Sequence, residues 1–573
     1  MAVVQKCAFM TRTKRKNRID VPSYAILAMA LLLSVALAVG INNGISLYND
    51  WDGFTYVYFS HIVSVYGMDR GISYIMNSGM PNVYFTDKYL LLAGNALIYY
   101  IMGLNGFSRG LFAMLCMIGT MVALFFVGKE VWGGRAGAIS ALAFGTIPAV
   151  ILEVGAAGDG TAVTLFSSLA VLAMVIGRRR GDLRYYAVSA LLIFIGALAG
   201  DETYMVALTI APFVLYYSLT GGARGAMRSP AAFFVAGAAA GVLLVLLLDM
   251  ALKGNPLSYF TARAAHGYYV YTPSPQFPEF LADLLPSPVP LYPFIVPSTI
   301  YPKIYPDVLG YYGYAALLCG AYLLARKVRG GKLPMVWLLI TFAYLSFGID
   351  SLSGPNFINA NPRFLIVMAP PISLVVGSGL NALLDDLSTR PRSRDTAKRS
   401  AAFRYVAYLV LVLALGVAIY TVIYTVSGFD STYAVELSPF INAGTFVKGL
   451  AAGTPLYVMT GAVNVTSMEN TTRGAVAAVE NATIESNWYT LMALGQFDGY
   501  NYRFNASYVG GNCGGIIGGA YVIFIDDQAY FESRYAQTGT DMGCSFSKIA
   551  VPLANGTVGS SNLGSLTVYK KLA

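Results

Sequence analysis

The chain has 573 residues, of which 56% are hydrophobic and only 12% are charged. Soluble domains carry about 25% charged residues, so this composition excludes a soluble protein of the same length. The net charge of +9 comes from short basic clusters between apolar runs, a pattern typical of membrane proteins and not of a nucleic-acid-binding surface. We therefore expect an integral membrane protein with membrane lipids around it and no nucleic-acid partner.

The first predicted element is a membrane-spanning helix. Residues 1–20 are basic, and an apolar run over 21–40 follows them. A run of about 20 apolar residues is long enough to cross a bilayer, whereas the apolar core of a signal peptide is shorter. The pattern predicts a cytoplasmic N-terminus and an uncleaved first helix.

Similar runs recur along 21–426, which we interpret as a polytopic α-helical membrane domain. About eleven runs are candidate membrane spans. They lie at about 22–41, 110–128, 136–152, 161–177, 185–200, 204–218, 230–250, 309–325, 334–349, 363–380 and 404–426. A further run, Tyr89–Met102, is shorter, and whether it crosses the membrane decides on which side every later loop lies.

The basic residues favour one topology. If 89–102 does not cross, most of the 38 Lys and Arg residues fall at the N-terminus and in loops on the same side. Few then fall in the two large loops of the other side, 41–109 and 251–308. Because basic loops favour the cytoplasm, this distribution predicts that 89–102 does not cross and that the C-terminal region is extracytoplasmic.

The region 427–573 has a mixed polar and apolar composition typical of a folded soluble domain. Segments rich in β-branched and aromatic residues predict strands at Thr454–Thr460, Tyr521–Ile525 and Ser565–Tyr569. Ser486–Gln496 predicts a helix. We expect a small α/β or α+β domain.

Covalent modifications predicted for this domain agree with an extracytoplasmic position. Candidate N-glycosylation sequons occur only here, at Asn464, Asn470, Asn481, Asn505 and Asn555. Cys513 and Cys544 are the only two cysteines of the domain. They form either a disulfide, as an oxidising compartment permits, or two buried free thiols.

Several common active-site patterns are missing from the sequence. It has no Gly-x-x-x-x-Gly-Lys-Ser/Thr motif, which argues against ATP-driven transport. It has no Cys/His metal-binding cluster, and His61 and His266 are its only histidines. A catalytic triad built on histidine is therefore not expected.

Carboxylates gather at the predicted outside ends of the spans, where they can surround a single site. They are Asp50, Asp52, Glu153, Asp159, Asp201 and Glu202. Asp50 and Asp52 precede the mostly aromatic segment Phe54–Tyr66, which we expect to lie along the membrane surface. Either aspartate can take a proton from an acceptor hydroxyl as general base, or it can simply cap that helix.

Cationic and aromatic residues on the same side suit a phosphate. The loop 251–308 contains Arg263, His266 and Tyr269, which either cover a sugar phosphate or anchor the loop at the membrane interface. Arg363 begins the 363–380 run. It either binds an anionic headgroup or lipid-linked phosphate, or extends from a helix end to the interface.

The order of these features resembles the GT-C glycosyltransferases, in particular the protein mannosyltransferases and aminoarabinose transferases that use polyprenyl-phosphate sugars. The resemblance covers about 20–380. It rests on Asp52 with Tyr56 (or Asp50 with Phe54), Asp87-Lys88-Tyr89-Leu90-Leu91, Gly106-Phe107-Ser108-Arg109, Gly158-Asp159-Gly160 and Asn361-Pro362-Arg363-Phe364-Leu365. In this family the region that corresponds to 89–102 is an interfacial helix.

The chain departs from the family pattern at three places. Gly53 stands where a glutamate commonly follows the first-loop aspartate, and the prolines after Lys88 are missing. Asp201-Glu202 replaces a stretch that is often basic. The Trp-Trp-Asp motif of oligosaccharyltransferases is absent, which disfavours that branch.

The resemblance implies inverting transfer of a sugar from a polyprenyl-phosphate donor to a hydroxyl of a protein, glycan or lipid. Asp52 or Asp50 would be the general base, and Asp159 would orient the acceptor, the base or a divalent metal ion. Phosphate and substrate ligands would be Lys88, Arg109, Arg263, His266, Tyr269 and Arg363. The metal, if used, would bind Asp159 and Asp52.

Two other interpretations fit a polytopic membrane protein. A transporter or lipid flippase would use Asp159, Asp201 and Glu202 as ion relays, but it predicts carboxylates at midspan and repeated halves. A non-catalytic scaffold needs far fewer spans than the sequence contains. The membrane is expected to be a plasma membrane or the endoplasmic reticulum.

Overall fold

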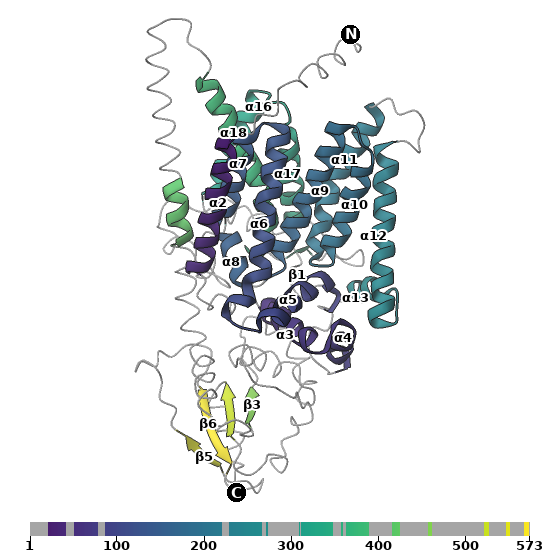
Figure 1. Ribbon diagram of the computed structural model, residues 1–573, viewed down its shortest axis with the longest axis vertical. Helices are drawn as coiled ribbons and strands as arrows, with labels where there is room; N and C mark the ends of the chain where they lie inside the picture. Colours follow the sequence, from purple (N-terminus) through teal and green to yellow (C-terminus); the bar gives the residue numbers. More distant parts are fainter. Residues whose placement is uncertain are drawn as a thin grey trace, which may run out of the picture.

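The computed structural model describes fifteen segments of the chain. These are residues 21–41, 51–77, 86–156, 158–220, 229–265, 271–272, 309, 311–347, 357–358, 362–388, 415–423, 456–460, 521–525, 546–549 and 566–571. Most of them form a bundle of long helices, and the last four form a separate β-sheet (Figure 1).

The structure describes thirteen helical elements in the first half of the chain. They are α2 (Val21–Ile41), α3 (Trp51–Tyr66), α4 (Met68–Asn77), α5 (Tyr89–Met102), α6 (Gly106–Val131), α7 (Gly134–Gly145), α8 (Pro148–Ala156), α9 (Gly160–Arg180), α10 (Arg184–Ala197), the 3-10 helix η3 (Asp201–Thr203), α11 (Tyr204–Thr220), α12 (Pro230–Lys253) and α13 (Ser258–Ala265). Figure 1 shows α3, α4 and α5 together at one end of the bundle, which we call the α3–α5 end.

The later helices complete the bundle. They are α16 (Tyr312–Ala325), α17 (Lys332–Phe347), the 3-10 helix η5 (Pro362–Met368) and α18 (Ala369–Ser388). Two short strands, β1 (Tyr271–Thr272) and β2 (Phe357–Ile358), pair antiparallel and join the loop after α13 to the segment before η5.

Local sequence explains where several helices begin and end. Asn105 caps α6, because its side chain accepts hydrogen bonds from the amides of Phe107 and Ser108, and the Ser108 hydroxyl accepts one from the Asn105 amide. Ser229 caps α12 just before Pro230, a residue suited to a first helical turn. Gly254 ends α12 in the left-handed conformation that glycine adopts at little cost.

The membrane-domain prediction is supported by six helices that are long and apolar enough to cross a bilayer among the described residues, or seven if the bent pair α7–α8 is one span. The pair bends by 55° where Pro148 begins α8. α10, α16 and α17 are shorter apolar helices within predicted spans, and α5, at 14 residues, is another short one. The expected total of about eleven spans stays a prediction.

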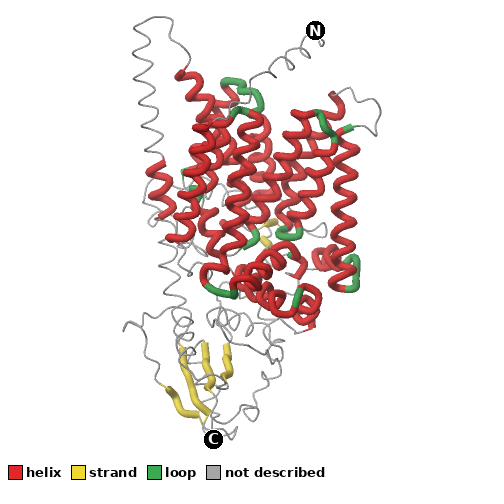
Figure 2. The backbone as a smooth tube through the Cα atoms, in the orientation of Figure 1, coloured by secondary structure: helices red, strands yellow, loops and turns green. Residues whose placement is uncertain are grey.

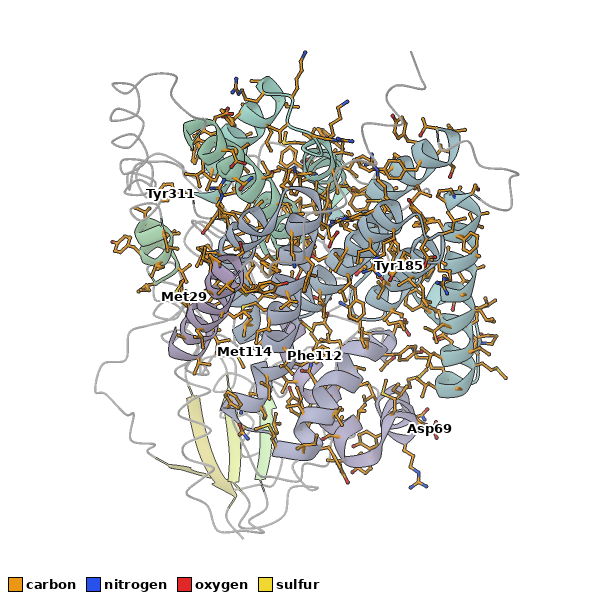
Figure 3. All side chains as sticks on the ribbon, turned by 45° about the horizontal axis from the view of Figure 1, so that its top comes forward. Met29, Asp69, Phe112, Met114, Tyr185 and Tyr311 are labelled. Carbon is orange, nitrogen blue, oxygen red and sulfur yellow. The ribbon has the colours of Figure 1, made fainter. Side chains whose placement is uncertain are left out.

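The outside of the bundle carries apolar side chains that water would not favour. Leu219 is 77% exposed, Leu318 74% and Met29 60%, and Figure 3 shows Met29 on the outer side of α2. Broad exposed apolar surface of this kind fits contact with lipid tails. Inside the bundle, Phe125, Phe144 and Trp337 are buried.

Charged pairs occupy the end opposite α3–α5. Arg135 pairs with Asp385 at 2.5 Å, Arg326 with Asp386 at 2.5 Å, and Arg179 with Glu130. All three arginines belong to the clusters predicted to be cytoplasmic. The structure thus places these three arginines at one end, while the orientation of that end in a membrane stays a prediction.

The C-terminal segments form one four-stranded mixed sheet in the order β3-β4-β6-β5 (Figure 2). The strands are β3 (Leu456–Thr460), β4 (Tyr521–Ile525), β5 (Phe546–Ile549) and β6 (Leu566–Lys571); β3 and β4 are parallel and the other pairs antiparallel. The three predicted strands are confirmed, whereas β5 was not predicted. The expected helix at 486–496, the five sequons and the Cys513–Cys544 disulfide lie outside the described residues.

The α6–α7 packing depends on glycine. A Cβ on Gly137 of α7 would overlap the Phe125 carbonyl of α6, and one on Gly128 would lie 2.5 Å from the Gly137 Cα. Because both obstacles are backbone atoms, no rotamer change relieves them.

We expect Gly137→Ala to separate α6 from α7 and to lower the free energy of unfolding by about 1–3 kcal/mol. The measurement is the melting temperature of the purified protein in detergent. Gly40→Ala is the matched control, since nothing lies within 4 Å of a Cβ there. Equal melting temperatures for the two variants would contradict the prediction.

Candidate functional site at the α3–α5 end

Four segments distant in sequence meet at the α3–α5 end of the bundle. Tyr56 comes from α3, Lys88 from the turn before α5, Asp159 from the turn before α9 and Glu202 from η3. We call these four residues the Lys88 cluster. All four lie in the predicted extracytoplasmic half of the topology.

The centre of the cluster is the Lys88 ammonium group. It donates a hydrogen bond to the Tyr56 hydroxyl at 2.5 Å and forms an ion pair with Oδ2 of Asp159. The Tyr56 hydroxyl donates to the same Asp159 oxygen at 3.4 Å. Lys88 Nζ also lies 4.8 Å from the centre of the Tyr56 ring, within the range of a cation–π contact.

Burial makes these interactions strong. The Lys88 side chain is 11% exposed, the Asp159 side chain 20%, and Tyr56 is buried. Coulomb interactions weaken less in such surroundings than in water. Asp159 is more open than Lys88 and Tyr56, so a substrate can approach this carboxylate.

Glycines around Asp159 hold its backbone close to a second carboxylate. Glu153 of α8 is buried, and its Oε1 accepts a hydrogen bond from the Gly160 amide at 2.8 Å. A Cβ on Gly158 would overlap the same carboxylate. The Gly158-Asp159-Gly160 sequence is therefore explained by the need to fit the chain around Glu153.

Gly160 also allows η5 to pack close to the site. A Cβ on Gly160 would lie 2.6 Å from Cγ2 of Ile366, which belongs to η5. η5 also contains Arg363, whose side chain is not described. The segment that carries this predicted phosphate ligand thus packs against the start of α9.

A second polar network fixes the chain on both sides of Lys88. Asp87 forms a buried ion pair with Lys253 at the end of α12, and the Tyr89 hydroxyl donates to Asp249 of the same helix at 2.6 Å. Lys88 lies between these two contacts. Its position therefore depends on the end of α12.

The network continues to η3 through Tyr259 of α13. The Tyr259 amide donates to Asp249 at 2.5 Å, and its hydroxyl donates to Asp201 at 2.8 Å. Tyr259 is buried. Through Asp201 it holds η3, the helix that carries Glu202.

The predicted catalytic aspartates are placed only in part. Asp52 lies in the first turn of α3, one turn before Tyr56, and its side chain is not described. Asp50 lies outside the described residues. Asp159 and Lys88, which the sequence analysis assigned to one site, are in direct contact.

The structure describes only some of the other predicted substrate-binding residues. Arg109 is buried in the first turn of α6, near Tyr99. Burial raises the pKa of Tyr99, and the Arg109 charge opposes that rise. Arg263 lies in α13, one turn after Tyr259, with its side chain not described, whereas His266 and Tyr269 lie outside the described residues.

Sequence reasoning missed Asp87, Asp249, Lys253 and Tyr259 as parts of the site. One signal for them was available, because Asp249 is the single acid in the apolar run 230–250. Pairing partners in distant segments cannot be read from that run.

Among the described residues, no group of three His, Cys, Asp or Glu side chains is arranged to hold a metal ion. Of the two expected ligands, Asp159 forms an ion pair with Lys88, and the side chain of Asp52 is not described.

The Lys253–Asp87 pair gives a prediction about stability. Its side chains are 3% and 0% exposed, so Lys253→Met leaves a buried carboxylate without its ammonium partner and should cost about 3–5 kcal/mol. We expect a large fall in melting temperature, partly recovered when Asp87→Asn is added. Arg184→Met is the control. It breaks an exposed ion pair with Asp182, so the melting temperature should change little. An equal fall for both single variants would refute the assignment.

The solved structures similar to this chain include two proteins at low identity. ArnT from Cupriavidus metallidurans bound to undecaprenyl phosphate is 12% identical, covers 94% of this chain and 97% of its own, and has a TM-score of 0.49. The oligosaccharyltransferase AglB from Archaeoglobus fulgidus, in complex with an inhibitory peptide and a dolichol-phosphate, is 13% identical, covers 88% and 69%, and has a TM-score of 0.46. Comparison with curated proteins finds no match.

A family model gives the more specific result. Residues 92–248 match the model described as dolichyl-phosphate-mannose-protein mannosyltransferase. The matched segment runs from α5 to α12 and contains Asp159 and Glu202 of the Lys88 cluster. The resemblance to this family predicted from the sequence is confirmed within the matched segment.

Proposed function

We propose that the chain transfers a sugar from a polyprenyl-phosphate donor to an acceptor hydroxyl at the α3–α5 end, on the extracytoplasmic side of the membrane. The observation that carries the proposal is the contact of Lys88 with Asp159 and Tyr56, a buried cation beside a partly open carboxylate, next to the segment that matches the family model.

A lipid-linked donor suits this location. Its isoprenoid tail stays in the bilayer, so the phosphate and sugar are presented at the membrane surface. Lys88 lies at the end of the bundle, where such a phosphate arrives, and an ammonium group binds phosphate oxygens through charge-assisted hydrogen bonds. Arg263 on α13 and Arg363 on η5 are proposed to add further positive charge.

The reaction is a single displacement. Asp52 removes the proton of the acceptor hydroxyl, and the oxygen attacks the anomeric carbon. The bond between that carbon and the phosphate oxygen breaks, the phosphate takes the electron pair, and the configuration inverts. Lys88 stabilises the charge that develops on the leaving phosphate. Asp159 orients the acceptor or the base.

The acceptor is a protein, glycan or lipid hydroxyl. The C-terminal region 427–573 is proposed to lie on the same side and to hold or select this acceptor. The membrane is a plasma membrane or the endoplasmic reticulum, as the sequence analysis expects.

The base assignment predicts that Asp52→Asn abolishes turnover while donor binding survives. Removing a general base typically costs about 10²–10⁴-fold in rate, whereas the amide keeps the size of the side chain. The measurement is consumption of a panel of labelled polyprenyl-phosphate sugars by the protein in lipid. Asp50→Asn is the matched control and should remain active. If Asp50→Asn is inactive and Asp52→Asn is active, Asp50 is the general base instead. No turnover of any donor by the wild type, with candidate acceptors supplied, would favour a transporter or scaffold.

The role of Lys88 predicts weaker donor binding in Lys88→Met. Losing one charge-assisted hydrogen bond should weaken binding of undecaprenyl phosphate about tenfold or more. Lys129→Met is a closely matched control, because Lys129 also donates to a tyrosine hydroxyl, that of Tyr24, at 2.5 Å and also lies 4.8 Å from its ring centre. Lys129 ends α6 at the opposite end of the bundle. Equal affinity of both variants would exclude Lys88 as a phosphate ligand.

A further inference from the structure

Glu202 contributes a carboxylate that the mechanism above does not use. It lies in η3, and its Oε2 atom is buried without a hydrogen-bond partner among the residues that the structure describes. A buried acceptor left in this state costs free energy. Its position in the Lys88 cluster therefore needs a reason other than stability.

The surroundings of Glu202 are fixed. Asp201, its neighbour, accepts a hydrogen bond from the buried Tyr259 hydroxyl at 2.8 Å, and the Thr203 hydroxyl donates to the Gly200 carbonyl at 3.0 Å. Both residues that flank Glu202 in sequence are thus held by hydrogen bonds. The position of η3 does not depend on any contact of the Glu202 Oε2 atom.

Glu202 lies close to Asp159, beside a glycine. A Cβ on Gly200 would lie 2.8 Å from Oε2 of Glu202 and 3.1 Å from Oδ2 of Asp159. Both carboxylate oxygens therefore border the small space next to Gly200, which a larger residue would fill. Two neighbouring carboxylates repel each other, and the Lys88 ammonium bound to Asp159 offsets only part of that repulsion.

The Lys88 cluster has two sides of opposite charge. The Lys88 ammonium attracts anions, whereas the Asp159–Glu202 side repels them and offers hydrogen-bond acceptors. A sugar phosphate has matching halves: an anionic phosphate and a ring whose hydroxyl groups donate hydrogen bonds. The Asp159 side chain is 20% exposed, so a sugar ring can reach the carboxylate side of the site.

We propose that Glu202 and Asp159 form a subsite for a hydroxyl group of the donor sugar, with Glu202 Oε2 accepting its hydrogen bond. This inference rests on the proposed function, because it assigns the sugar end of the same donor whose phosphate binds Lys88. The subsite orients the ring relative to the phosphate. Glu202 is therefore a specificity-determining residue that distinguishes a sugar-bearing lipid phosphate from a bare one.

The test compares binding of three probes: undecaprenyl phosphate, and the same lipid phosphate carrying mannose or glucose. Wild type should bind one of the sugar-bearing lipids more tightly than the bare lipid phosphate. Glu202→Ala should reduce this preference about tenfold and leave the affinity for undecaprenyl phosphate unchanged. Glu202→Gln keeps a neutral hydrogen-bond acceptor, so its preference for the sugar-bearing lipid should lie between that of the wild type and that of Glu202→Ala. Glu130→Gln is the control, since Glu130 pairs with Arg179 at the opposite end.

Thermal stability separates a binding role from a structural one. Removing a carboxylate that lies close to Asp159 relieves repulsion, so Glu202→Gln should melt at or above the wild-type temperature. A clear fall in melting temperature would assign Glu202 to structure and overturn the proposal. So would an unchanged sugar preference in Glu202→Ala. Failure of the proposed function has a different result, because the wild type itself would then bind none of the three lipids.

Discussion

Two lysine–aspartate ion pairs, Lys88–Asp159 and Lys253–Asp87, hold the α3–α5 end of the bundle together. They matter because the surrounding helices are apolar, and a buried carboxylate there is tolerated only with a partner. One pair joins the start of α5 to the start of α9, and the other joins it to the end of α12. The chain around Lys88 is thus fixed from two directions, which gives this proposed phosphate ligand a defined position.

The two pairs differ in exposure, and this difference separates structure from function. Lys253 and Asp87 are almost completely buried, with further support from Asp249, Tyr89 and Tyr259 close by. Asp159 is partly open and shares its lysine with Tyr56. Under the proposed function, a donor phosphate that reaches Lys88 would compete with Asp159 for the ammonium group. It would then leave Asp159 with less compensating charge when the acceptor binds, which would link the two halves of the proposed reaction.

Much of the helical part was predictable, because a bilayer imposes a length and a composition on each element that crosses it. The apolar runs located α2, α6, α9, α11 and α12. The capping residues Asn105 and Ser229, which set the starts of α6 and α12, were recognised only in the structure. Three of the four C-terminal strands were also predicted, since β-branched and aromatic residues are concentrated in them. β5, with the sequence Phe-Ser-Lys-Ile, lacks that concentration and was missed.

The sequence by itself determined that this protein belongs in a membrane and which residues could bear charge at one end of it, because hydropathy and charge distribution are properties of short segments. The assignment of Lys88 and Asp159 to one site came from the family resemblance of their motifs. Only the tertiary structure decided that Glu202 lies close to Asp159 beside Gly200, that Asp87 needs Lys253, and that Tyr259 joins α12 to η3. These contacts join residues up to 166 positions apart, and their geometry is set by how helices pack, through close approaches such as that of Gly137 to Phe125, which no local pattern encodes.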